Sequence, residues 1–299
     1  MYRMKGVIPP MITPFKENGD VDYEGLVTLV TFLKDKVDGL FITGSYGAGA
    51  LMSEEERMKV AETVVNTVGG KIAVIAHIGS TNTRSSVRLA EHAAKIGVDA
   101  VSAVGPFYYK HNADSICLFY SEIVKAVNAV NPEIPVYVYN NTSFQGYTMD
   151  LKLIRRLKEE AGVRGVKDAT FDIMTHANYT RLLKDDTFDV ASGTEAMWLQ
   201  SCVTGTQAFI PGIGNVFPEL CKKMWTEGME GRYEDCRKTQ FMVNEVRDIM
   251  YLAKSTQLAI YAMLEIRGVL KCYPRSPFIA ASEEEKANIR ARLKTLGLI

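Results

Sequence analysis

Lys167 is the first residue in the chain whose type and position suggest covalent chemistry. It ends the apolar run formed by residues 163–166, so its amine is expected at the end of a buried strand. Burial disfavours the ammonium form, and an uncharged lysine amine can attack a carbonyl carbon. The alternative is a structural lysine that extends to solvent or pairs with Asp168.

Tyr139 ends the preceding apolar run, residues 136–139. If the two runs form neighbouring strands, its phenol lies within reach of the Lys167 amine and can move a proton. A free tyrosine ionises only near pKa ~10, so this role needs a neighbouring hydroxyl, cation or substrate carboxylate to relay the proton. The alternative is a half-buried tyrosine that only packs.

A glycine-rich loop, Gly44-Ser45-Tyr46-Gly47, follows an earlier apolar run, residues 39–42. Glycine lets the backbone approach a ligand closely, and the amides and hydroxyls between the glycines can bind a carboxylate. Many tight turns share this pattern, so the loop indicates a binding site only together with the lysine and the tyrosine.

The elements that must position these residues are short apolar runs that alternate with helical segments. Most runs are continuously apolar, as is typical of parallel strands covered on both faces. The series suits a closed (β/α)8 TIM barrel better than the alternative, a doubly wound open sheet, because no glycine-rich dinucleotide motif follows an early strand. The eight expected strands are residues 7–8, 39–42, 72–76, 100–104, 136–139, 163–166, 188–191 and 208–210.

Beyond about residue 217 the pattern is purely helical. Helices are expected over residues 218–226, 232–251, 256–269 and 282–296. The resulting division is a barrel over residues 1–225 and a C-terminal helical region over residues 226–299 that packs outside the barrel or extends one rim.

Composition excludes several other classes of protein. Lys plus Arg and Asp plus Glu both number 35, which leaves no net field to attract nucleic acid or an anionic membrane. The five cysteines form no C-x-x-C pair, and the four histidines lack metal-ligand spacing, so neither disulfides nor a metal site is expected. With no apolar run of ~18 residues and no signal-peptide pattern, a soluble cytoplasmic protein is expected.

Several motifs occur in an order and spacing that are known from one family. They are Gly6-Val7-Ile8 with Thr13-Pro14-Phe15, Gly39-Leu40-Phe41 leading into Gly44-Ser45-Tyr46-Gly47, Ser53-x-x-Glu56-Arg57, Gly105-Pro106-Phe107-Tyr108-Tyr109, Tyr137-Val138-Tyr139-Asn140 and Gly165-Val166-Lys167-Asp168. Over nearly its whole length the chain resembles the dihydrodipicolinate synthase/N-acetylneuraminate lyase family of pyruvate-dependent class I aldolases.

The resemblance implies a role for each matching residue. Lys167 is implied to form a Schiff base with a small 2-keto acid, and Tyr139 to transfer protons. Ser45 and the backbone of Tyr46 are implied to bind the 2-keto acid carboxylate. Tyr108 is implied to reach the active site of a neighbouring subunit, in a homotetramer built as a pair of dimers. The expected partners are a 2-keto acid and an aldehyde, without a cofactor.

The sequence departs from the family pattern at the glycine-rich loop and after the fifth expected strand. Where the family has Gly-x-Thr-Gly-Glu, this chain has Tyr46 in place of a small relay hydroxyl and Ala48 in place of the acid. Lysine-biosynthetic members carry an arginine for the far carboxylate of their aldehyde, but residues 140–146 offer Phe144 instead. This stretch therefore supplies no cation to bind that acid end.

Substrate choice is also expected to depend on Gly193, Glu195 and Ile210, which follow or end the last two strands. Glu195 can accept hydrogen bonds from a polyol, but it can equally be the first-turn acid of the next helix. The favoured function is cleavage or formation of a sugar-derived 2-keto acid, with a dehydratase as a variant. The alternatives are 4-hydroxy-tetrahydrodipicolinate synthesis and, in another class, a non-catalytic 2-keto acid sensor.

Overall fold

A computed structural model describes all residues, 1–299, and its centre is a closed barrel of parallel strands. The strands are β1 (Gly6–Val7), β2 (Gly39–Ile42), β3 (Ala73–His77), β4 (Ala100–Val104), β5 (Val136–Asn140), β6 (Gly165–Asp168), β7 (Asp189–Ser192) and β8 (Ala208–Phe209). They form one eight-stranded sheet in sequence order, with β8 paired to β1.

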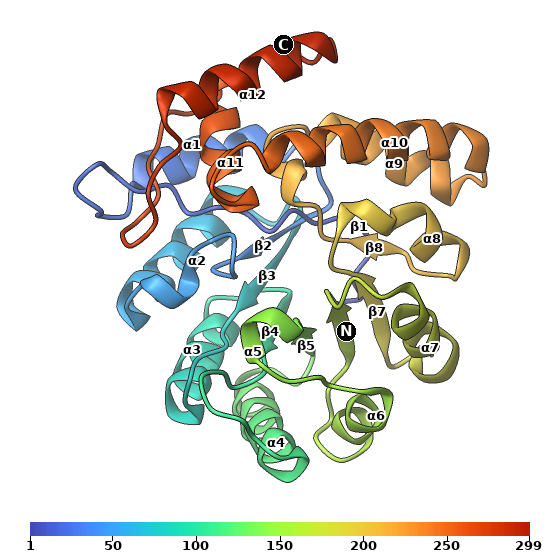
Figure 1. Ribbon diagram of the computed structural model, residues 1–299. Coiled ribbons are helices and arrows are strands. Elements are labelled where there is room, and N and C mark those ends of the chain that lie inside the picture. Colours follow the sequence, from blue (N-terminus) through green and yellow to red (C-terminus); the bar gives the residue numbers. More distant parts are fainter.

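Backbone hydrogen bonds between the first two strands close the sheet. Asp38 N donates to Val7 O at 3.0 Å, and Phe41 N donates to Pro9 O at 3.0 Å. The alternative of a doubly wound open sheet is therefore wrong, and the expected (β/α)8 barrel is confirmed. Figure 1 looks along this barrel and shows the helices arranged around the strands.

The helices alternate with the strands and then continue alone. They are α1 (Tyr23–Leu33), α2 (Glu54–Val68), α3 (Thr83–Lys95), α4 (Ala113–Val130), α5 (Thr142–Gln145), α6 (Leu151–Glu159), α7 (Ile173–Leu183), α8 (Trp198–Val203), α9 (Pro218–Met229), α10 (Tyr233–Met250), α11 (Thr256–Ile266) and α12 (Glu283–Thr295). Short 3₁₀ helices occur at Gly49–Leu51, Glu195–Met197 and Gly212–Asn215.

Every expected strand is present, and the main difference lies at the strand ends. β3, β5 and β6 extend to His77, Asn140 and Asp168, because a parallel ladder continues as long as its neighbour offers backbone partners, whatever the side chain. Apolar runs end earlier, where the first polar side chain appears. This extension places the polar residues that follow the runs within rigid strands.

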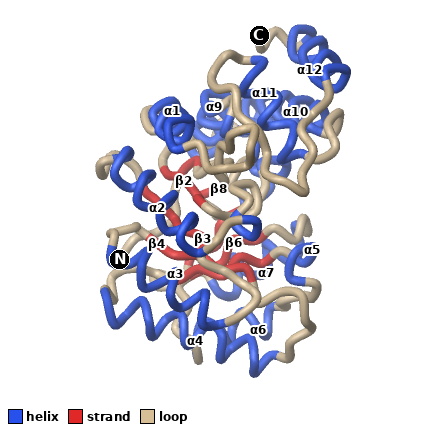
Figure 2. Tube along the Cα trace, turned by 90° about the vertical axis from the view of Figure 1, so that its left-hand side faces the viewer, coloured by secondary structure: helices blue, strands red, loops and turns tan.

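The C-terminal helices lie along one flank of the barrel in both Figure 1 and Figure 2. One hydrophobic core includes barrel residues such as Val7 and tail residues such as Met263. Residues 225 and 226, between which the sequence suggested a division, both lie within α9, a helix that packs against β1. No helix of the chain is both long and apolar enough to cross a membrane.

Candidate active site

Strand register places Lys167 and Tyr139 side by side at the C-terminal ends of β6 and β5. Side chains alternate along a strand, so Lys167 points into the barrel and Asp168 points out of it. Asp168 instead accepts a hydrogen bond from the ring of His176, at 3.1 Å, behind the sheet. Lys167 itself is only 2% exposed. Both structural alternatives, a lysine paired with Asp168 and a lysine extended to solvent, are therefore wrong.

Aromatic rings surround the Lys167 amine. Its Nζ lies 3.8 Å from the ring centroid of Tyr139 and 4.2 Å from that of Phe41. These ring faces offset part of the cost of burying a cation, but no carboxylate pairs with the amine. Burial lowers the pKa of Lys167 to about 7 from its ordinary value of 10.5. A large fraction of the amine is thus uncharged near neutral pH, as nucleophilic attack requires.

This pKa predicts how the rate of imine formation depends on pH. Because the uncharged amine is the nucleophile, the rate of reaction with a 2-keto acid is expected to rise about tenfold per pH unit below about pH 7 and to level off above it. Stopped-flow or quenched borohydride trapping between pH 5 and 9 measures this profile. An increase centred near the ordinary lysine pKa would contradict the buried, uncharged amine.

The Tyr139 hydroxyl lies between two polar side chains. It is 3.2 Å from Ser45 Oγ, and Asn141 Nδ2 donates to it at 3.2 Å. Burial raises the pKa of Tyr139, and the hydrogen bonds with Ser45 and Asn141 oppose that rise. The neutral phenol can therefore pass a proton between a substrate atom and Ser45 Oγ without becoming a stable phenolate.

The glycine-rich loop connects the barrel to the C-terminal helices. The Tyr46 hydroxyl donates to Thr256 Oγ1 at 3.0 Å, and Gln257 Nε2 donates to Tyr46 O at 2.9 Å. A Cβ at Gly212 would lie 2.6 Å from the Tyr46 hydroxyl, so glycine is required there to leave room for the phenol. The bulky side chain at position 46 is thus directed toward α11, and its ring forms part of the cavity wall.

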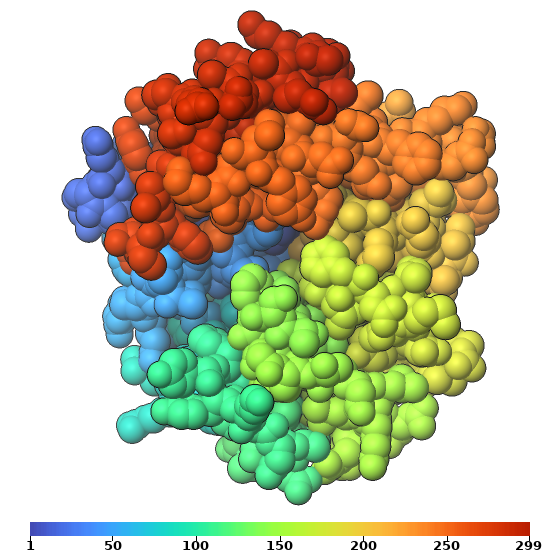
Figure 3. Space-filling view, in the orientation of Figure 1, coloured from blue at the N-terminus to red at the C-terminus, as the bar shows by residue number.

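A cavity of about 340 Å³ contains most of the residues expected from the sequence. Figure 3 shows the corresponding hollow near the centre of the face, where blue, green and orange segments meet. The expected residues that line it are Ser45, Tyr46, Tyr139, Phe144, Lys167, Gly193, Glu195 and Ile210. Five strands and their loops thus converge on one volume beside the Lys167 amine.

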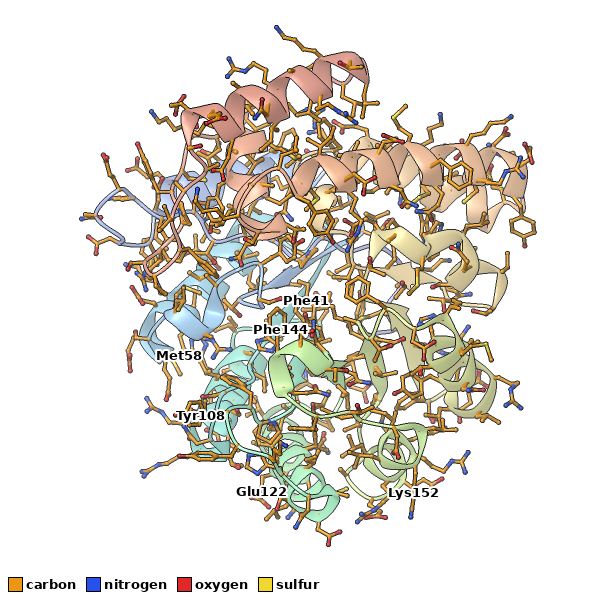
Figure 4. All side chains as sticks on the ribbon, viewed as in Figure 1. Phe41, Met58, Tyr108, Glu122, Phe144 and Lys152 are labelled. Carbon is orange, nitrogen blue, oxygen red and sulfur yellow. The ribbon has the colours of Figure 1, made fainter.

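Two expected residues lie elsewhere. Gly44 lines an adjoining, mainly apolar cavity of about 240 Å³ that shares Ser45 and Tyr139 with the first one. Tyr108 is 82% exposed on the loop after β4 and lines neither cavity. In Figure 4, Phe144 lies near the centre of the barrel and Tyr108 lies well to the side of it. A contribution of Tyr108 to the site of another subunit stays a prediction.

Glu195 begins the 3₁₀ helix after β7, yet its side chain turns into the cavity. The residue is 2% exposed, and its Oε2 accepts a hydrogen bond from Gly212 N at 3.1 Å. Its Oε1 has no hydrogen-bond partner. A buried carboxylate oxygen without a donor is costly, so a ligand donor at this oxygen is chemically favoured.

Arg247 is a charged residue of this site that the sequence did not predict. It extends from α10 into the cavity, and its Nη1 lies 3.5 Å from Glu195 Oε1. Residues 140–146 supply no cation to the cavity, as expected, and the guanidinium comes from the C-terminal helices instead. No local sequence pattern predicts the contact between Arg247 and Glu195, because these residues are far apart in the sequence. Asn141, the partner of Tyr139, was missed as well.

The described side chains offer no group of three or more His, Cys, Asp or Glu residues that could hold a metal ion. His77, which lies beside Tyr139, is buried and accepts a hydrogen bond from Val104 N at 3.0 Å. Burial, together with Arg57 and Lys167, holds the pKa of His77 well below its usual value, so the ring is uncharged.

Comparison with known proteins agrees with this geometry. The family model described as "Dihydrodipicolinate synthetase family" matches residues 3–296. The chain belongs to the dihydrodipicolinate synthetase family. A 4-hydroxy-tetrahydrodipicolinate synthase from Archaeoglobus fulgidus is 32% identical over 99% of both chains.

Solved structures of the family superpose closely on this chain. A dihydrodipicolinate synthase aligns with a TM-score of 0.89 at 29% identity, covering 99% of this chain and 100% of the other. A sialic acid aldolase from Ruminococcus gnavus, in a variant of its catalytic lysine, aligns with a TM-score of 0.91 at 27% identity, covering 98% and 95%. The chain is thus an enzyme of the class I aldolase type, and family membership disfavours the non-catalytic sensor.

Proposed function

We propose that this protein is a pyruvate-dependent class I aldolase in which Lys167 forms the Schiff base. The observation that carries the proposal is a buried amine, with a pKa lowered to about 7, between the rings of Tyr139 and Phe41. Such an amine is uncharged often enough to attack a ketone, and the surrounding rings exclude water from the adduct.

The neighbouring residues support each step of the reaction. Lys167 Nζ attacks the keto carbon of pyruvate, water leaves, and the resulting iminium withdraws electrons from the methyl carbon. That carbon loses a proton to form an enamine and then adds to the carbonyl carbon of an aldehyde. Tyr139 and Ser45, 3.2 Å apart, are placed to carry the proton to the new alkoxide, and water then releases the product. The backbone of Ser45 and Tyr46 is proposed to hold the pyruvate carboxylate.

Two acceptor aldehydes compete. The similarity to curated 4-hydroxy-tetrahydrodipicolinate synthases supports aspartate semialdehyde better than a sugar-derived acceptor. The second candidate, formation or cleavage of a sugar-derived 2-keto acid, is supported by the partnerless Glu195 Oε1 and by sialic acid aldolases among the structural relatives. We also propose that Tyr108 reaches the active site of a neighbouring subunit in a homotetramer.

Borohydride trapping tests the shared step. Incubation with pyruvate and sodium borohydride is expected to add one reduced pyruvate to the protein, and peptide mapping is expected to place it on Lys167. Omission of pyruvate is the control. A missing adduct, or one that maps to another lysine, would remove the proposal. Turnover with pyruvate plus either aspartate semialdehyde or a hydroxylated aldehyde then separates the two candidates.

A further inference from the structure

The main cavity is lined by an ion pair that is incomplete on both sides, Glu195 with Arg247. Glu195 Oε1 has no hydrogen-bond donor, and the nearest cation, Arg247 Nη1, lies 3.5 Å away without forming a hydrogen bond to it. The guanidinium donates instead to Thr194 Oγ1, at 3.5 Å, and to Tyr251, at 3.0 Å. Since a guanidinium has five N–H groups, donors remain free beside the free acceptor.

The surrounding residues hold the arginine in this position. Its guanidinium lies 5.4 Å from the ring centroid of Phe171 and 5.8 Å from that of Tyr251. Phe171 has a φ of 60°, a left-handed conformation that is strained for an aromatic residue and is found mainly where function requires it. Both side chains of the pair thus line the cavity, and they belong to elements other than the glycine-rich loop proposed to hold the pyruvate carboxylate.

The chemistry of the pair restricts what can bind there. A carboxylate could accept from Arg247 but would lie near the negative Oε1 of Glu195, and the pair as a whole offers no net charge to offset the lost hydration of an anion. A hydroxyl group can accept from Arg247 and donate to Glu195 at the same time. A hydroxyl therefore satisfies both the free N–H groups of Arg247 and the free oxygen of Glu195.

We propose that Arg247 is a specificity-determining residue that, with Glu195, binds a hydroxyl at the distal end of the acceptor aldehyde and disfavours acceptors that end in an acid. This inference rests on the proposed Schiff-base function and selects the second of its two acceptors, a hydroxylated aldehyde, over the acid-ended aspartate semialdehyde that sequence similarity favours.

The test compares four-carbon aldehydes that differ only at the distal carbon. With pyruvate as donor, kcat/KM is measured for 4-hydroxybutanal, butanal and succinic semialdehyde. The wild-type enzyme is expected to favour 4-hydroxybutanal over butanal by about tenfold to hundredfold, as hydrogen bonds to charged groups contribute. In Arg247→Met this ratio is expected to fall toward one. In Glu195→Gln, where the arginine charge becomes unbalanced, kcat/KM for succinic semialdehyde is expected to rise.

Arg237→Met is the matched control, because it removes the same charge from the same helix at an exposed position paired with Glu234. It should leave the ratio unchanged. The inference is overturned if Arg247→Met preserves the ratio, or if the wild-type enzyme prefers succinic semialdehyde and loses that preference in Arg247→Met. If Arg247→Met does not fold, Glu195→Gln alone decides. Borohydride trapping in the same samples separates the failures: no adduct on Lys167 refutes both proposals, whereas an adduct without discrimination refutes only this one.

Discussion

Replacing Lys167 by methionine is expected to reduce turnover by at least about 10⁴-fold, the scale seen when a covalent nucleophile is removed. Methionine fills a similar volume among the rings of Phe41 and Tyr139, so the barrel should remain folded. The measurement is kcat with pyruvate and the best acceptor, together with intact-protein mass after borohydride. A pyruvate adduct on the variant would contradict the assignment.

The same variant is expected to be more stable than the wild-type protein. The amine, with a folded-state pKa of about 7, binds fewer protons than in the unfolded chain between about pH 7 and 10.5, so wild-type stability falls as pH decreases through that window. Methionine does not titrate, so the stability of the variant lacks this dependence on pH. The gain in unfolding temperature should therefore be larger at pH 7 than at pH 10. Lys152→Met, at an exposed position of α6, is the control and should show neither effect.

Replacing Tyr139 by phenylalanine is expected to lower kcat by about 10²- to 10⁴-fold, the usual contribution of a positioned acid or base. The ring that packs against Lys167 remains, but Ser45 and Asn141 lose their shared partner. Because the amine is still present, KM for pyruvate should change much less than kcat. Steady-state kinetics with varied pyruvate separates the two parameters.

Tyr137→Phe is the matched control for this variant. Tyr137 lies on the same strand, β5, and is equally buried, but its hydroxyl donates to Asp189 Oδ2, at 2.8 Å, at the opposite end of the barrel. Its loss should reduce stability without a comparable loss of kcat. Equal losses of kcat in the two variants would show that Tyr139 acts only by packing.

The sequence predicted those parts of the site that depend on neighbouring strands. β5 and β6 are consecutive in a parallel barrel, so residues that end them must be neighbours at the C-terminal edge, and Tyr139 and Lys167 are paired in register. The apolar character of the runs also predicted the burial that lowers the pKa of the lysine. These conclusions needed only local patterns and the rule that consecutive strands pair.

Contacts between distant segments could not be predicted in this way. Arg247 occupies a helix whose periodicity gives its face but not its distance from Glu195, which depends on how α10 packs against the loop after β7. The direction of the Tyr46 phenol could not be predicted either, because it depends on Thr256 and on the absence of a side chain at Gly212.

The cavity is built from two parts of the chain. One part is the barrel, and the other consists of α10, α11 and the segment before α12. The strands supply the amine and the phenol, whereas Arg247, Thr256, Gln257 and Phe278 enter from the C-terminal region. Substitutions in the C-terminal region can therefore change the preference for the acceptor aldehyde without altering the residues that react with pyruvate. A chimera that exchanges only this tail between two relatives should alter aldehyde preference, because it replaces Arg247 beside Glu195, and should keep the imine step of the recipient barrel.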